Sequence, residues 1–281
     1  MKDTNRLLII TADDFGMCPS VNKAIKEVVD FGLVKNCDLI PVAPAFKDAV
    51  NICKNYPLLD IGVHITLTSE FPALSYRPIS NSNKVSSLID PKSGAFLKNV
   101  KLFQSRAKPI EVYREVVAQI EYILSTGIKP THLSSHIFVL NCFGAELSAM
   151  IRFNNMIMEI SKEYKLPFRM PLRIAHAGVY NGLAEMYRKQ GYLVLDDLIS
   201  GYKIDKKRKE SFYMRALSGL NEGITELLVH CGNPGAELKK INPRRWACYN
   251  EEKRIFTSQS MKEHIEKNRI KLINWSDLKI R

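Results

Sequence analysis

The sequence lacks several features that would each point to a class of protein. No apolar stretch is long enough to cross a bilayer. None of the six cysteines stands in a Cys-x-x-Cys pair, so zinc ligation by cysteine has little support. The first residues, Met1–Arg6, have no apolar signal-peptide region. We therefore expect a cytoplasmic protein with reduced thiols and no membrane span.

Signatures of nucleic-acid binding are also missing. Zinc-finger, helix-turn-helix and RNA-binding aromatic motifs are absent, although the formal net charge is +12. The densest basic run, Lys203–Lys209, is more typical of a solvated loop or helix face than of a nucleic-acid site. We therefore expect no nucleic-acid partner.

Short apolar runs alternate with amphipathic stretches through most of the chain. The runs that indicate strands are Leu7–Thr11, Cys37–Val42, Asp60–Thr66, Thr131–His136, Phe168–Pro171, Tyr192–Leu195, Thr225–His230 and Ile270–Asn274. The stretches that indicate helices are Pro19–Phe31, Ala45–Cys53, Glu111–Leu124, Glu146–Tyr164 and Ser258–Asn268. This order predicts an α/β fold, an irregular TIM-like (β/α) barrel of about seven strands. Without repeats or linkers, residues 1–281 are expected to form one domain.

The alternation pauses over residues 67–107. This segment is rich in Ser, Pro, Asn and Lys and has no sustained periodicity. A loop of this length inside a compact domain is usually functional. We expect a long loop insertion that serves as a lid or as a wall of a substrate site.

Polar residues follow the apolar runs at several predicted strand ends. Asp13, Asp14, His64, His136 and His230 all occupy such positions. In barrels and open α/β sheets, the active site lies at the carboxyl edge of the strands. One carboxylate and two imidazoles can bind a divalent ion and leave positions open for water and substrate. A second carboxylate beside the ligand can then act as a general base.

Simpler interpretations of these residues exist. A single histidine at a strand end is more often a hydrogen-bonded structural residue. Asp13 or Asp14 could cap the helix that follows. Adjacent residues of an extended strand also point to opposite faces, so both aspartates reach one site only if the chain turns there. The joint arrangement at four strand ends favours a site.

Four motifs carry a resemblance to a known family. Thr11–Gly16, Gly62–Thr68, Thr131–His136 and Glu226–His230 resemble the YdjC-like carbohydrate deacetylases, which include enzymes acting on chitooligosaccharides and hopanoid-linked sugars. The resemblance runs in order from residue 7 to about residue 274. It implies a distorted (β/α) barrel, often a homodimer, with one divalent cation such as Mg²⁺ or Zn²⁺.

The resemblance also implies roles for individual residues. Asp13 would be the catalytic base, and His230 the general acid. Asp14, His64 and His136 would be the metal ligands, and Arg169 and Phe15 would contact substrate. The implied reaction removes the acetyl group from an N-acetylated sugar and releases acetate. Phe71 and Tyr76 could line the sugar site, although packing within the loop is an equally good interpretation.

The chain departs from the family pattern in two of the motifs. Ser134 stands where the family often has Asp, and Phe138 stands where it has a second His. His230 is followed by Cys231 rather than Pro. A ligating histidine needs an outer hydrogen-bond acceptor, and Ser135 is the candidate that the sequence offers for His136.

Three alternatives remain open at this point. The chain could be a metal-dependent hydrolase of another amide or ester, because the same ligands would serve. It could be a non-catalytic carbohydrate-binding relative, although binding alone requires neither Asp13 nor His230. A basic nucleic-acid-binding protein is disfavoured by the missing motifs. The sugar, the metal and the oligomeric state are not determined by the sequence.

Overall fold

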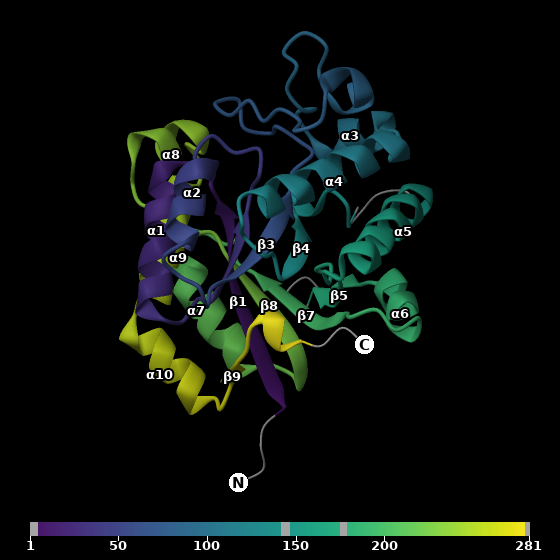
Figure 1. Ribbon diagram of the computed structural model, residues 1–281. Coiled ribbons are helices and arrows are strands. Elements are labelled where there is room, and N and C mark those ends of the chain that lie inside the picture. The colour runs from purple at the N-terminus through teal and green to yellow at the C-terminus, as the bar shows by residue number, and fades with distance from the viewer. Residues whose placement is uncertain (1–4, 142–146, 175–178, 279–281) are drawn as a thin grey trace.

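The computed structural model describes residues 5–141, 147–174 and 179–278, and these are built around one sheet (Figure 1). Its strands are β1 (Arg6–Phe15), β2 (Asn36–Leu39), β3 (Asp60–Ile65), β4 (His132–Ser135), β5 (Pro171–Ile174), β6 (Val179–Tyr180), β7 (Leu195–Ser200), β8 (Gly223–Val229) and β9 (Lys271–Leu272). They lie in the order β4-β3-β2-β1-β8-β7-β5-β6, and β9 also pairs with β1. All pairings are parallel except that of β5 with β6.

The two ends of this sheet meet. Leu133 of β4 forms a parallel bridge with Phe168, which lies just before β5. The Leu133 amide donates to Pro167 O at 2.8 Å, and the Arg169 amide donates to Leu133 O at 2.8 Å. Apart from the short β9, the seven parallel strands β1–β5, β7 and β8 therefore curl until their edges touch. The predicted irregular α/β barrel of about seven strands is confirmed.

Helices cover the outside of the curled sheet. They are α1 (Pro19–Phe31), α2 (Phe46–Cys53), α3 (Val100–Arg106), α4 (Pro109–Ser125), α5 (Leu147–Tyr164), α6 (Gly182–Lys189), α7 (Lys206–Ser218), α8 (Ala236–Ile241), α9 (Trp246–Phe256) and α10 (Gln259–Lys267). Figure 1 shows α1, α2, α8 and α9 on one side of the sheet and α4, α5 and α6 on the other. No helix in the described ranges is long and apolar enough to cross a membrane.

The segment 67–107 is more structured than its composition suggests. It contains the 3₁₀ turns η1 (Ser82–Lys84) and η2 (Ser86–Leu88) as well as α3. Leu88 and Phe103 are fully buried. Tyr76 is only 1% exposed, which supports the packing interpretation of this residue rather than contact with a sugar.

Two strands near the middle of the chain begin later than predicted. The predicted strand Tyr192–Leu195 is β7, which starts at Leu195, and the predicted strand Phe168–Pro171 is β5, which starts at Pro171. Asp197 interrupts the apolar pattern of β7, but its carboxylate is buried against Arg173 of β5, with two hydrogen bonds of 2.9 Å. A charged residue is compatible with this buried strand because its partner lies on the neighbouring strand.

The inner face of the curled sheet is polar, whereas barrels of this type are usually filled by branched aliphatic side chains. Asp38 and His132 are fully buried there, and Asp38 Oδ1 lies 2.8 Å from His132 Nε2. Gly62 stands in register with both residues. A Cβ atom at Gly62 would lie 2.3 Å from Asp38 Oδ1 and 2.4 Å from His132 Nε2. Gly62 therefore leaves the space in which this pair forms.

We expect Gly62→Ala to destabilise the fold. The added methyl group overpacks the site, which typically costs about 1–3 kcal/mol, and it also displaces a buried hydrogen-bonded pair. Denaturant unfolding of the variant and of wild type measures the loss. Gly182→Ala is the matched control, because a Cβ there meets no atom within 4 Å. Equal stability of the two variants would contradict the role assigned to Gly62.

Candidate active site and metal centre

A bulge in β1 brings two adjacent aspartates to one site. The strand continues through Phe15, whereas the sequence predicted that it ends at Thr11. Its register with β2 shifts between Ala12 and Phe15, and Asp14 has a φ of 70°. This left-handed conformation is the turn that two neighbouring residues need in order to face the same way.

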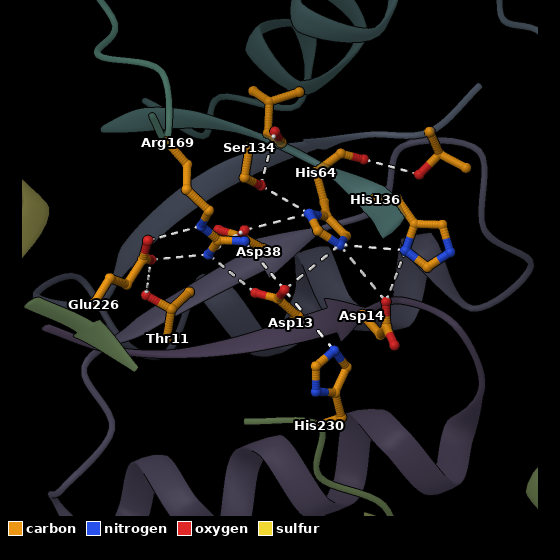
Figure 2. Close-up of polar contacts among 12 residues, drawn as sticks. Thr11, Asp13, Asp14, Asp38, His64, Ser134, His136, Arg169, Glu226 and His230 are labelled. Atoms are coloured by element: carbon orange, nitrogen blue, oxygen red, sulfur yellow. Dashed lines mark hydrogen bonds and ion pairs between the residues drawn. The ribbon is translucent and has the colours of Figure 1, made fainter. Parts of the chain in front are cut away.

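Asp14, His64 and His136 converge at the carboxyl ends of β1, β3 and β4 (Figure 2). Asp14 Oδ1 lies 3.0 Å from His136 Nδ1 and 3.6 Å from His64 Nε2. The two histidine nitrogens lie 3.3 Å apart. All three side chains are at most 4% exposed. The structure thus brings together the three residues that the family resemblance implied as ligands.

A separate partner holds the other polar atom of each of these three groups. Tyr249 OH donates to Asp14 Oδ2 at 3.2 Å. Ser134 Oγ lies 2.7 Å from His64 Nδ1. Glu70 Oε1 lies 2.6 Å from His136 Nε2. The atoms left facing the centre are Asp14 Oδ1, His64 Nε2 and His136 Nδ1. Outer partners of this kind are typical of metal-ligating side chains, whose tautomer and orientation they set.

The residues fit a divalent cation on two further grounds. Ligands about 2.1 Å from one ion lie roughly 3.0–3.5 Å apart at tetrahedral or octahedral angles, close to the separations observed here. Asp14 Oδ1 is also buried and accepts no well-aligned hydrogen bond from the described residues. A buried carboxylate oxygen normally has a hydrogen-bond donor or a cation as its partner. A divalent cation would be such a partner for Asp14 Oδ1.

Protons and metal compete for this centre. Burial opposes a charge on His136, but Glu70 and Asp14 raise the pKa of its imidazole well above the ordinary value. Burial likewise opposes the charge on Asp14, yet His136 and His64 hold the pKa of the carboxyl well below its usual range. Because metal binding requires the neutral imidazole, the affinity should fall as the pH is lowered.

Asp13 and His230 lie beside the three groups. In Figure 2, His230 approaches Asp13 from the side opposite His64. Asp13 Oδ2 lies 4.0 Å from His64 Nε2 and 4.0 Å from His230 Nε2. Burial raises the pKa of the Asp13 carboxyl despite the opposing effects of Arg169 and His64. Two titratable groups thus face each other next to the candidate metal centre.

Arg169 contacts Asp13 from the side that faces away from Asp14 (Figure 2). Its side chain is 1% exposed. The guanidinium donates to both oxygens of Asp13, at 3.1 and 3.0 Å, and to both oxygens of Glu226, at 2.8 Å. It also lies 2.9 Å from Asp38 Oδ2. Arg169 therefore holds the Asp13 carboxylate in a fixed orientation.

The remaining residues that the sequence singled out take structural positions. Phe15 is fully buried in the hydrophobic core, where it supports the turn after β1. Ser135 Oγ accepts from the Leu140 amide at 2.9 Å. The expectation that Ser135 orients His136 is therefore wrong, because Glu70 occupies that role. Phe138 follows His136 in the 3₁₀ turn η3 (His136–Phe138) and has a φ of 56°.

Sequence reasoning missed Asp38, Glu70 and Tyr249. Asp38 carried a signal, because a charged residue inside an apolar strand needs a buried partner. Glu70 also carried one, since it comes two residues after the Gly62–Thr68 motif. Tyr249 lies on α9, which was not predicted, and it had no signal in the sequence.

The chain is similar to known proteins over nearly its whole length. A carbohydrate deacetylase of Thermoanaerobacter pseudethanolicus is 28% identical, covering 98% of this chain and 100% of the relative. One from Enterococcus faecalis is 29% identical, covering 98% and 99%. A crystal structure of a putative cellobiose-phosphate cleavage protein from Enterococcus faecalis superimposes with a TM-score of 0.80 and 26% identity, covering 98% and 99%.

A family model confirms the resemblance seen in the motifs. The model, described as YdjC-like protein, matches residues 7–267. This range includes all the residues that form the site, from Asp13 to Tyr249. The chain belongs to the YdjC-like protein family.

Proposed function

We propose that the protein is a metal-dependent hydrolase that removes the acetyl group from an N-acetylated sugar or oligosaccharide. The observation that carries this proposal is the convergence of Asp14, His64 and His136 beside Asp13 and His230. The substrate class rests on the full-length relatives that are named carbohydrate deacetylases.

The chain supplies ligands for one divalent cation. Asp14 Oδ1, His64 Nε2 and His136 Nδ1 would hold it, and the donor set leaves further positions open. When bound, such a cation polarises an amide carbonyl and lowers the pKa of water. Two imidazoles suit Zn²⁺ or a similar transition metal better than Mg²⁺, which prefers oxygen ligands.

The other groups handle the protons. Asp13, fixed by two hydrogen bonds from Arg169, would take a proton from the water that attacks the acetyl carbon. His230, which lies on the other side of Asp13, would give a proton to the nitrogen that leaves. The C–N bond breaks, and the products are acetate and the free amino sugar. Separate acid and base groups are what hydrolysis of an amide with a poor leaving group requires.

Acetate release is the direct test. Purified protein, loaded in parallel with Zn²⁺, Mg²⁺ and other divalent ions, is incubated with N-acetylated mono-, di- and oligosaccharides. We expect acetate from at least one substrate and none after treatment with a chelator. Metal-loaded protein that releases no acetate from the panel would favour a carbohydrate-binding relative or a hydrolase of another amide or ester.

The homodimer and the cytoplasmic location expected from the sequence stay predictions.

Glu70→Gln should weaken metal binding without abolishing it. The change removes the negative acceptor of His136 Nε2, and loss of such an outer partner typically costs about 10–100-fold in metal affinity. Titration calorimetry with Zn²⁺ measures the effect. Ser135→Ala is the matched control, because Ser135 Oγ accepts from the Leu140 amide, whereas Glu70 pairs with His136 Nε2. If the two variants bound Zn²⁺ equally well, Glu70 would have no part in orienting His136.

A further inference from the structure

The basic run Lys203–Lys209, which the proposed function leaves unused, ends in a buried lysine. Lys209 is 1% exposed, whereas Lys206, Lys207 and Arg208 face solvent. Its ammonium group donates to Gly201 O at 2.7 Å and contacts Glu252 Oε1. Burying two charges carries a large desolvation cost, so such a pair is weak evidence for stability. We therefore examined whether the Lys209–Glu252 pair has a role in the active site.

Glu252 of α9 connects this lysine to the active site. Its side chain is 1% exposed. Oε1 accepts from Lys209 and, at 2.8 Å, from Tyr213 OH. Oε2 accepts from the backbone amide of His230 at 2.5 Å. A Cβ atom at Gly201 would lie 2.3 Å from Tyr213 OH, so the glycine permits the tyrosine to take this position.

The His230 ring lies between Glu252 and Asp13. Its Nδ1 is buried without a hydrogen-bond partner among the described residues and lies 3.8 Å from Glu252 Oε2. Its Nε2 lies 4.0 Å from Asp13 Oδ2. Tyr202 and Tyr249 contact the ring, with centroid separations of 5.0 and 5.9 Å. One ring nitrogen thus faces a buried carboxylate, and the other faces the reaction site.

We propose that Glu252, held by Lys209 and Tyr213, is a positioning residue that keeps Nδ1 of His230 protonated and leaves Nε2 as the nitrogen that serves the leaving amine. A carboxylate facing one imidazole nitrogen selects the tautomer in which that nitrogen carries the proton. The inference rests on the proposed function for the identity of the reaction, but the orientation and tautomer of the ring do not depend on it.

The charge state of Glu252 agrees with this role. Burial opposes the charge, but His230 and Lys209 hold the pKa of Glu252 at about 2. The carboxylate is therefore negative at neutral pH. Neutral His230 would then carry its proton on Nδ1, facing Glu252, and protonated His230 could give up the Nε2 proton while the Nδ1 proton stays on the ring.

Paired variants separate positioning from folding. Glu252→Gln alone leaves Lys209 buried without a counter-ion and is expected to destabilise the protein. The double variant Lys209→Met, Glu252→Gln removes both charges together, which buried pairs tolerate far better. Glu210→Gln is the matched control, because Glu210 pairs with Arg254 between the same two helices, α7 and α9, but on their exposed side. His230→Gln is the reference for loss of the acid itself.

The first readout compares leaving groups. An amine must be protonated to leave, whereas 4-nitrophenolate leaves without help. We expect the double variant to lower kcat for an N-acetylated sugar by at least about tenfold, which is part of the roughly 10²–10⁴-fold that a positioned acid contributes. KM for the sugar and hydrolysis of 4-nitrophenyl acetate should stay close to those of Glu210→Gln. Equal losses on both substrates, or no loss on the sugar, would overturn the proposal.

The second readout needs no turnover. Imidazole ¹⁵N spectra report which ring nitrogen is protonated, and the His230 signals are those lost in His230→Gln. We expect Nδ1 to be protonated in wild type and the proton to be shared between the nitrogens in the double variant. An unprotonated Nδ1 in wild type, or an unchanged tautomer in the double variant, would refute the role of Glu252. If wild type releases no acetate but the tautomer shifts as expected, only the proposed function fails.

Discussion

Replacing His64 or His136 by alanine should remove the divalent cation and acetate release together. Each change deletes one of three donor atoms that lie 3.0–3.6 Å apart. It also leaves Asp14 Oδ1 with one imidazole instead of two. The loss should exceed the roughly 10–100-fold that removal of an outer partner costs, because a ligand itself is gone.

Metal analysis after dialysis measures the metal content of each variant directly. The increase in thermal stability on adding the metal is a second measure of binding. A cation that binds only the folded state raises stability by about 2.7 kcal/mol when present at 100 times its Kd. We expect this increase in wild type and in His264→Ala, whose side chain contacts Met214 O and Ser218 away from the site. Undiminished metal content in both His64→Ala and His136→Ala would refute the ligand assignment.

Asp13→Asn should retain the metal but lose most of its turnover. The variant cannot accept a proton from water, and a positioned base contributes roughly 10²–10⁴-fold to the rate. Its two oxygens now accept from Arg169 Nη1 and Nη2, so the amide nitrogen of Asn would face the guanidinium and disturb this contact. Part of any loss could then come from a shifted Arg169.

Asp197→Asn controls for that effect. Asp197 is also a buried aspartate held by two hydrogen bonds from an arginine, Arg173, but it lies on β7 outside the site. We expect a comparable loss of stability in the two variants and a loss of turnover only in Asp13→Asn. If Asp13→Asn lost its metal as well, Asp13 would be a ligand or the two adjacent aspartates would have exchanged roles.

Local signals were enough to predict several elements correctly. The predicted helix Pro19–Phe31 coincides with α1, because Pro19 favours a helix start and Gly32 adopts a φ of 92° at its end. The carboxyl ends of β1, β3, β4 and β8 were recognisable because an apolar run gives way to Asp or His at each of them. The extension of β7 through Asp197 to Ser200 was missed, since the partner that accommodates Asp197 lies 24 residues away in the sequence.

The residues of the candidate site also fall into those that the sequence predicted and those that only the structure shows. Asp13, Asp14, His64, His136 and His230 could be named from the sequence because parallel strands deliver their carboxyl ends to one edge of the sheet. Their sequence positions and the family motifs were therefore sufficient to predict the residues at the centre of the site.

The outer partners could only be found from the tertiary structure. Glu70 and His136 are 66 residues apart, and Asp38 and His132 are 94 residues apart. Nothing in either sequence segment specifies such a contact, because it depends on how strands and loops pack around a closed sheet. The sequence by itself determined which residues reach the centre. The folded structure alone decided how each of them is oriented, because orientation comes from hydrogen bonds to residues that no local pattern places nearby.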